Sequence, residues 1–285
     1  MNIEQYLYYI AYTLIYLVLA ILMKAILNFR SGKLYKADEQ IADGNMAVGF
    51  RRSGAQLGLA IAMIGVLSGS SNSDFVNDLF TTASYGLLAV GFMLVSLLVT
   101  DRAVLPSVNN TEELKEGNLA IGLVEFGTLI MTGIIAYASI KGDDGGFISS
   151  LVYFVAGQVT VVLLVVAYEK IFARKVNLVQ SVVDNNLSAG IYLSGKIIAY
   201  GLILQSAIVS QSNIDVPTLS VQAIEFATAA FSGMIMLYLF EILIDRFIVT
   251  ATKASDIIKN DQQVAALQLS LAKIGMALIL GMAIL

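Results

Sequence analysis

The chain of 285 residues contains no cysteine and no histidine, and it has only two prolines. Without cysteine it forms no disulfide and offers neither a thiol nucleophile nor a thiolate ligand for zinc. Without histidine it lacks the side chain that most often moves protons near neutral pH. Two prolines leave long stretches of the chain free of helix breakers.

Charge is also scarce, because only 13% of the residues are charged while 58% are hydrophobic, and the mean hydropathy is +0.80. A soluble domain usually carries about 25% charged residues. About 20 apolar residues in a helix cross the hydrocarbon layer of a membrane. Such runs lie at 6–27, 46–67, 79–100, 118–140, 147–168, 187–208, 221–244 and 262–285. We therefore predict an all-α integral membrane protein with eight transmembrane helices, surrounded by lipid and without a nucleic-acid partner.

A short pattern occurs four times, and each copy lies between two apolar runs. It reads D-G-N-M-A-V-G-F-R-R-S-G around Asn45, E-G-N-L-A-I-G-L-V-E-F-G around Asn118 and D-N-N-L-S-A-G-I-Y-L-S-G around Asn186. A divergent copy around Gln262 reads N-D-Q-Q-V-A-A-L-Q-L-S-L, and the four anchors are 73, 68 and 76 residues apart. Since each copy holds two helices, all copies keep one orientation. We predict four parallel two-helix repeats (1–70, 71–142, 143–213 and 214–285), paired into halves 1–142 and 143–285 and assembled as a pseudo-symmetric bundle.

Basic residues are distributed unequally between the two sets of connections. The four connections that carry the motif hold eleven lysines and arginines, whereas the opposite ones hold only Lys141. Short basic loops resist translocation across a membrane. This bias predicts that the motif connections are cytoplasmic and that the N and C termini lie outside.

The repeat motif combines an anchor at a helix start with small residues that recur along one helical face. An acidic residue and a turn residue before an apolar run are typical of a capped helix N-terminus; alternatively, the four starts converge into a vestibule that attracts anions. Small residues allow close helix packing, or line a permeation path. An acid 17 residues before three of the anchors either anchors the helix end at the membrane interface or makes a hydrogen bond to a motif loop. The motif residues are Asn45, Gly49, Gly54, Asn118, Gly122, Gly127, Asn186, Gly190 and Gly195, and the helix-end acids are Asp101, Glu169 and Asp245.

Ionisable residues within the apolar runs form a second set of candidates. A charge at mid-membrane costs about 2.5–3.5 kcal/mol on insertion scales, so these groups should face the interior or find partners. We expect a buried cluster of Arg52, Glu125 and Glu241, with Arg51 reaching toward the membrane surface. Lys196 and Lys273 lie about 15 Å past their anchors, and Gln56 occupies the position equivalent to Lys273. They indicate either a hydrated path for an anion or proton, or structural ion pairs.

The period of about 72 residues and the acid-Gly-Asn-x-Ala-x-Gly signature at Gly44–Gly58 and Gly117–Gly127 resemble the YjfL-like family of bacterial inner-membrane proteins. The resemblance weakens in the third copy and is faint in the fourth. It implies a multi-pass protein of the bacterial plasma membrane in a double-length form, and it implies no substrate.

Two functions are consistent with these features. The first is a channel or transporter for a small ion or solute. The second is a non-transporting membrane scaffold or stress-response partner that acts through its cytoplasmic motif loops. Candidate partners are a cytoplasmic protein or further copies of this chain. No G-x-S-x-G, H-E-x-x-H or P-loop pattern occurs, so we expect neither an enzyme nor a cofactor site.

Overall fold

The computed structural model describes residues 3–69, 74–141, 146–171, 176–210, 219–248 and 253–284, and their secondary structure is entirely helical. Each repeat contributes an outer helix, a six-residue helix and an inner helix, in this order. The outer helices are α1 (Ile3–Ser31), α4 (Phe75–Val99), which the π-helical turn η1 (Thr100–Val104) continues, α7 (Gly146–Ile171) and α10 (Leu219–Phe247). The short helices are α2 (Ala37–Ala42), α5 (Asn110–Lys115), α8 (Leu178–Val183) and α11 (Ala254–Lys259). The inner helices are α3 (Met46–Leu67), α6 (Leu119–Lys141), α9 (Leu187–Val209) and α12 (Gln263–Ile284).

All eight apolar runs of the sequence therefore lie in long helices. Seven of these helices are long and apolar enough to cross a membrane. The exception is α3, whose hydropathy is lowered by Arg51, Arg52 and Gln56 although it is 22 residues long. The short helices were expected only as connections.

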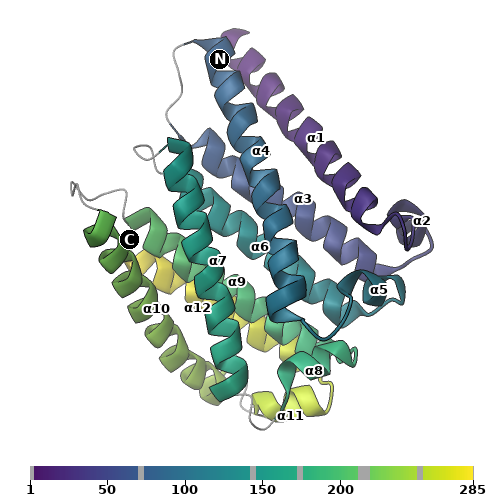
Figure 1. Ribbon diagram of the computed structural model, residues 1–285. Helices are drawn as coiled ribbons and strands as arrows, with labels where there is room; N and C mark the ends of the chain where they lie inside the picture. Colours follow the sequence, from purple (N-terminus) through teal and green to yellow (C-terminus); the bar gives the residue numbers. More distant parts are fainter. Residues whose placement is uncertain are drawn as a thin grey trace.

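The four inner helices stand side by side in a row, each packed along its whole length against the next, in the order α3, α6, α9 and α12. The outer helices cover one side of this row (Figure 1). The expected pseudo-symmetric bundle is wrong in this respect, because α3 and α12 occupy the two ends of an open row. The central inner helices α6 and α9 are consequently buried on nearly every side, and the hydrophobic core follows them.

Glycines allow the inner helices to approach closely. The Cα atoms of Gly58 and Gly133 face each other across α3 and α6, and a Cβ atom on Gly133 would lie 2.7 Å from Gly58 Cα, which no packed structure tolerates. Lipid is as apolar as the helices, so the hydrophobic effect does not hold helices together within a membrane. Close backbone contact of this kind stabilises their association instead.

The repeats share one orientation, as predicted, because Gly122 lies against Ala47 at one end of the α3–α6 interface and Gly133 against Gly58 farther along. The four short helices gather at one end of the molecule, and both chain ends lie away from them (Figure 1). The motif loops are thus brought into one row.

Candidate functional site

Each of the three asparagine anchors makes one contact within its own repeat and one with the next repeat. The side-chain oxygen caps the inner helix of its own repeat by accepting from Val48, Ile121 or Ala189 N–H at 3.2, 3.1 and 2.8 Å. The amide nitrogen donates to a carbonyl at the end of the next repeat's short helix. These bonds run from Asn45 to Leu114 (2.9 Å), from Asn118 to Val183 (3.0 Å) and from Asn186 to Ile258 (2.8 Å). The capping interpretation therefore holds, and the helix starts stand in a row instead of converging.

The residue before each anchor adopts a left-handed backbone, which ends the short helix. Glycine serves this role at Gly44 (φ +88°) and Gly117 (φ +82°). In the last two repeats the residue is Asn185 or Asp261, whose side chain caps the preceding inner helix by accepting from Ala120 N–H (3.2 Å) or Ser188 N–H (2.8 Å). Burial raises the pKa of Asp261, but hydrogen bonds from Ser188, Gln263 and the N–H of Leu187 outweigh this effect and hold the pKa below its usual range.

Most of the motif glycines lie in helix interfaces. A Cβ atom on any of Gly54, Gly122, Gly127, Gly190 or Gly195 would fall within 3 Å of a neighbouring helix. Gly49 is different, because a Cβ atom there would meet nothing within 4 Å. The residue four past the anchor thus packs against a neighbouring helix in the second and third repeats (Gly122 and Gly190) and is free in the first (Gly49).

The helix-end acids differ in their contacts. Asp101 accepts from Asn110 in the second motif loop (2.9 Å) and pairs with Arg30. Glu169 accepts from Val179 N–H in the third motif loop (3.4 Å). Asp245 has a buried Oδ1 without a hydrogen-bond partner in the described part of the chain, and residues 249–252 of its loop are not described.

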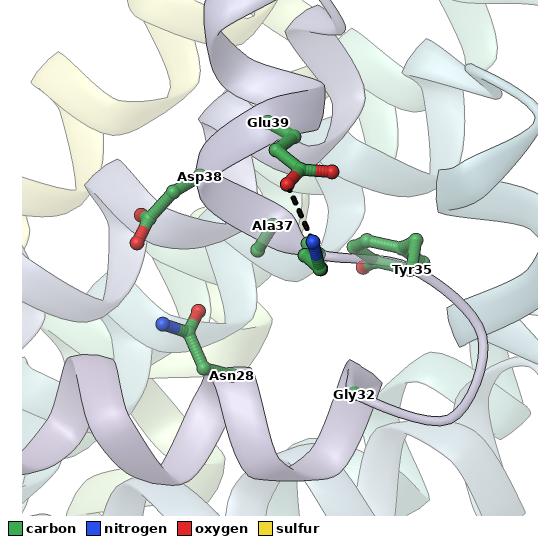
Figure 2. A pocket seen from close by; sticks show the side chains of 7 residues that line it. Asn28, Gly32, Tyr35, Ala37, Asp38 and Glu39 are labelled. Carbon is green, nitrogen blue, oxygen red and sulfur yellow. Dashed lines mark hydrogen bonds and ion pairs between the residues drawn. The ribbon is translucent and has the colours of Figure 1, made fainter.

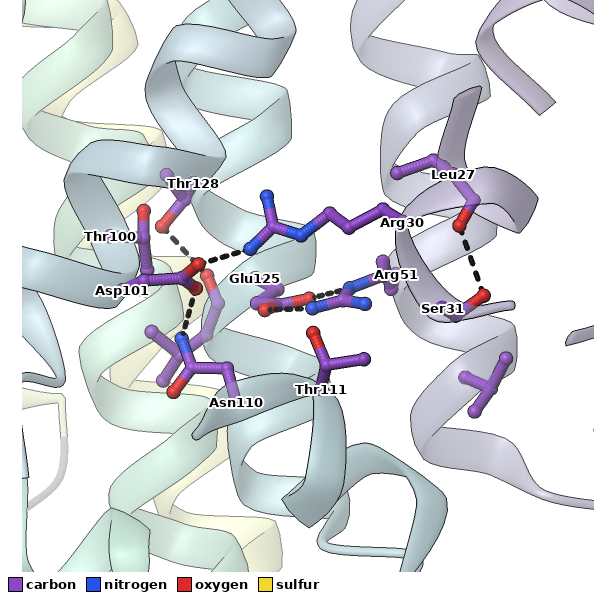
Figure 3. A network of polar contacts seen from close by, with 12 residues as sticks. Leu27, Arg30, Ser31, Arg51, Thr100, Asp101, Asn110, Thr111, Glu125 and Thr128 are labelled. Atoms are coloured by element: carbon purple, nitrogen blue, oxygen red, sulfur yellow. Dashed lines mark hydrogen bonds and ion pairs between the residues drawn. The ribbon is translucent and has the colours of Figure 1, made fainter. Parts of the chain in front are cut away.

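Arg51 and Glu125 form the centre of a first buried cluster, the arginine cluster, with Arg30, Asp101 and Asn110 (Figure 3). Arg51 donates to both carboxylate oxygens of Glu125, with Nη2 2.7 Å from Oε1. Arg51 is 3% exposed and Glu125 is fully buried. The expectation that Arg52 pairs with Glu125 and that Arg51 reaches the surface was wrong. Successive residues on a helix differ by 100°, so only Arg51 faces α6.

Arg52 instead faces α1 and α2, where it donates to Asn28 Oδ1 (2.6 Å) and Asp38 Oδ1 (3.1 Å). A hydrogen bond from Lys24 and the charge of Arg52 lower the pKa of Asp38. Asn28 and Asp38 border a cavity of about 330 Å³ beside the α1–α2 connection (Figure 2). This cavity is open and lies at the end of the row, and Arg52 does not line it.

A second buried cluster, the lysine cluster, contains Lys196, Glu241 and Lys273. Lys196 Nζ donates to both oxygens of Glu241, at 3.0 and 2.8 Å, and lies 3.6 Å from the ring centre of Tyr168. Lys273 Nζ donates to Tyr192 OH at 2.7 Å and is 3.8 Å from Glu241 Oε2. Lys196 and Lys273 are 2% and 1% exposed, so both ammonium groups are enclosed.

The predicted candidates are therefore divided between different places. Glu125 belongs to the arginine cluster, Glu241 joins the two lysines, Arg52 lies near α2, and Gln56 is exposed on α3. The sequence interpretation missed the tyrosines, although Tyr192, Lys196 and Tyr200 follow at intervals of four and share one face of α9.

A cavity of about 120 Å³ opens beside the lysine cluster, between α7, α9 and α10. Lys196, Glu241, Tyr168 and Tyr200 supply its polar wall. The remaining wall is mostly apolar: Leu164, Ala167, Met234, Leu237 and Tyr238. Because α7 and α10 make little contact with each other, the cavity faces the side of the molecule that a bilayer would cover. It is a small notch and not a continuous pore.

The chemistry available here is ionic and protonic. In the described ranges, no three or more acidic side chains come close enough together to hold a metal ion. The lysine cluster offers two ammonium groups, one carboxylate and three phenols. Such a group can attract an anion, or exchange protons with one.

Comparison with known proteins identifies the architecture but no activity. A family described as "Domain of Unknown Function (DUF350)" matches residues 1–140 and again residues 144–284, which confirms the internal duplication. A "UPF0719 transmembrane protein" of Aquifex aeolicus (strain VF5) is 29% identical over 173 residues, 58% of this chain and 62% of the relative. The match thus spans less than two thirds of that relative. No solved structure matches the chain. The chain belongs to the DUF350 family and is an integral membrane protein that carries the family domain twice.

Proposed function

We propose that this protein transports a small ion or solute and that the lysine cluster is its binding site. The observation that carries the proposal is a pair of buried lysines at mid-helix that share one carboxylate beside a cavity. Ionisable groups inside a membrane are costly, and they usually mark an ion or substrate path.

The two buried clusters differ in a way that favours the lysine cluster. In the arginine cluster Arg51 is paired with Glu125 and Arg30 with Asp101, so each cation has its own carboxylate. In the lysine cluster Lys196 and Lys273 both lie within 4 Å of a single carboxylate, Glu241. Asp245, one turn farther along α10, is a second acid near both lysines. It is the sharing of one close carboxylate by two enclosed ammonium groups that supports binding of an anion, or a proton-linked exchange.

The geometry also supports a route to the site. Lys196 and Glu241 line the cavity between α7 and α10, whereas Lys273 lies deeper, behind Tyr192. A ligand would reach Lys196 first and would compete with Glu241 for its ammonium group. Transport then requires α7 and α10 to move, because the notch does not pass through the row.

The proposed topology has eight spans, with α3 included because its arginines find partners within the protein. The motif loops are cytoplasmic and both termini are outside, which the eleven-to-one bias of basic residues supports. We place the protein in a bacterial plasma membrane, in agreement with its resemblance to YjfL-like proteins, and we propose that it is not an enzyme.

One observation favours the alternative function, a scaffold. The four short helices gather at one end of the molecule (Figure 1). In α2, Glu39 is exposed with its partner Lys36. A soluble partner could bind at this end without any transport.

Purified protein in liposomes distinguishes the two functions. We expect chloride or proton flux, measured with a fluorescent indicator inside the vesicles, to fall at least tenfold in Lys196→Ala and Lys273→Ala. Lys141→Ala is the matched control, since it removes one lysine far from the cluster and should leave flux unchanged.

Removing one partner of a buried ion pair can unfold the protein. The triple variant Lys196→Met, Glu241→Gln and Lys273→Met removes all three charges of the lysine cluster together, keeps similar volumes, and should fold without transporting. Equal flux in this variant and in the unmodified protein would contradict the proposal. Absence of flux for both ions, together with a soluble protein that copurifies, would favour the scaffold.

A further inference from the structure

The exposed face of α3 corresponds to a face that is buried in the other three inner helices. Counted from each anchor, this face holds the residues at positions 4, 8, 11 and 15. In α6 and α9 it packs against the preceding inner helix, with Gly122 on Ala47, Gly190 on Ala120 and Gly133 on Gly58. In α3, which stands at the end of the row, the same positions are Gly49, Ser53, Gln56 and Ala60.

Ser53 shows what kind of neighbour this face accommodates. The equivalent serines are Ser194, which packs on Gly127, and Ser270, which packs on Gly195 and donates to Ile191 C=O at 3.1 Å. Ser53 is exposed instead, although it is the same residue type at the same position. The first repeat thus retains an interface residue where this chain supplies no partner.

Gln56 lies at the middle of this face and is also exposed. It is the eleventh of the 22 residues of α3, about 15 Å from either end, and so near the centre of the membrane. In the described part of the chain its side-chain amide makes no hydrogen bond. An amide in lipid favours a partner helix, and two glutamines satisfy each other because each side chain both donates and accepts.

We propose that two copies of this chain pair through this face, with α3 of one copy against α3 of the other around a two-fold axis. The inference rests on the eight-span topology proposed above. Because the same four residues then meet their own counterparts, the interface is self-complementary.

The opposite end of the row excludes the alternative, in which copies join head to tail. Head-to-tail joining would place the free face of α12 on α3. In α3, α6 and α9 the residue nine past the anchor is glycine. A Cβ atom there would lie 2.8, 2.3 or 2.5 Å from the next helix or its side chains. In α12 this residue is Leu271, which is 58% exposed, and Val264 on the same face is 83% exposed. Large side chains at these positions prevent another inner helix from docking.

The natural absence of cysteine allows a direct test. Gln56→Cys, introduced singly and oxidised in native membranes, should form a disulfide-linked species of twice the chain mass, because only a two-fold interface brings a residue to its own copy. Leu271→Cys and Val18→Cys are the matched controls, since both side chains are exposed on other helices. We expect at least tenfold more cross-linked dimer from Gln56→Cys than from either control.

Three results would overturn the proposal. They are equal cross-linking in the controls, a product with the mass of a different protein, or a dimer that appears only when Gln56→Cys and Leu271→Cys chains are mixed.

Labelling separates this inference from the topology on which it rests. If α3 crosses the membrane, Gln56→Cys in intact vesicles resists a water-soluble maleimide, whether or not the copies pair. Gln56→Leu should weaken dimerisation in lipid about tenfold, as expected for one lost hydrogen bond in a membrane, and should leave the flux assay unchanged.

Discussion

Arg51 and Glu125 offer the sharpest test of how this fold tolerates charge. Glu125 is fully buried, and both of its oxygens accept from Arg51. Glu125→Leu would leave a guanidinium group enclosed among helices without its counter-charge. Breaking a buried pair in this way costs about 3–5 kcal/mol, whereas replacing both partners by apolar residues is often neutral or stabilising by about 1–4 kcal/mol. We therefore expect Glu125→Leu to destabilise the protein by about 3–5 kcal/mol and the double variant with Arg51→Leu to recover most of that loss.

Unfolding in mixed micelles, followed by circular dichroism, measures these free energies. Arg52→Leu is the matched control, because it removes the adjacent arginine whose partners Asn28 and Asp38 lie near the surface. Arg52 is itself buried, but its acidic partner Asp38 is more than half exposed. Removing Arg52 therefore leaves no enclosed charge and should cost less than Glu125→Leu. Effects of Arg51→Leu and Glu125→Leu that simply add, or a loss below about 1 kcal/mol for Glu125→Leu, would refute the assignment of a buried ion pair.

Three further predictions concern the connections between repeats. Asn118→Ala removes a helix cap and a hydrogen bond to the next repeat, so it should lower the free energy of unfolding by about 1–2 kcal/mol in the same assay. A loss no larger than that of Gln262→Ala would contradict this double role of Asn118. Gly133→Leu should abolish folding, because its side chain meets the backbone of α3, and a folded variant with unchanged helix content would disprove the packing described here. Asp261 has a pKa below its usual range, so its stabilising effect is present above the unfolded value of about 3.9 and is lost as pH falls through the lower folded value. The stability difference between the unmodified protein and Asp261→Asn should therefore shrink below about pH 4, and a difference that does not vary with pH would exclude this role.

The sequence was sufficient to predict the long helices, because apolar runs have a length that a membrane imposes. The run at 46–67 coincides with α3, and the run at 187–208 with α9 to within one residue. The short helices were not predicted, since six residues are too few to show a helical period. Their starts still carried a signal: Asn109 and Asn177 each cap a short helix.

The candidate site was predicted less completely. The position of a residue along a helix is easier to predict from sequence than the direction in which its side chain points around the helix axis. Lys196 and Lys273 are buried within the protein, as expected for charged residues in apolar helices, yet their shared partner Glu241 was expected beside Glu125. A difference of one residue turns a side chain by 100° around the helix and so decides its ion-pair partner, as Arg51 and Arg52 show. The open row itself could not be predicted, because repeats of one orientation are equally consistent with a closed bundle.

Comparison of the two halves separates what maintains the fold from what the site requires. The asparagine hydrogen bonds between repeats and the glycines between inner helices recur along the chain. Each pair of neighbouring repeats has the same backbone groups to satisfy at the same short distance. The buried charges do not recur: the position of Arg51 is occupied in the second half by Tyr192, and that of Glu125 by Leu269. A purely structural ion pair would serve both halves equally well. The framework is the same in both halves, but the residues at these positions differ. This difference supports the proposed binding role of the lysine cluster, a role that the first half does not share.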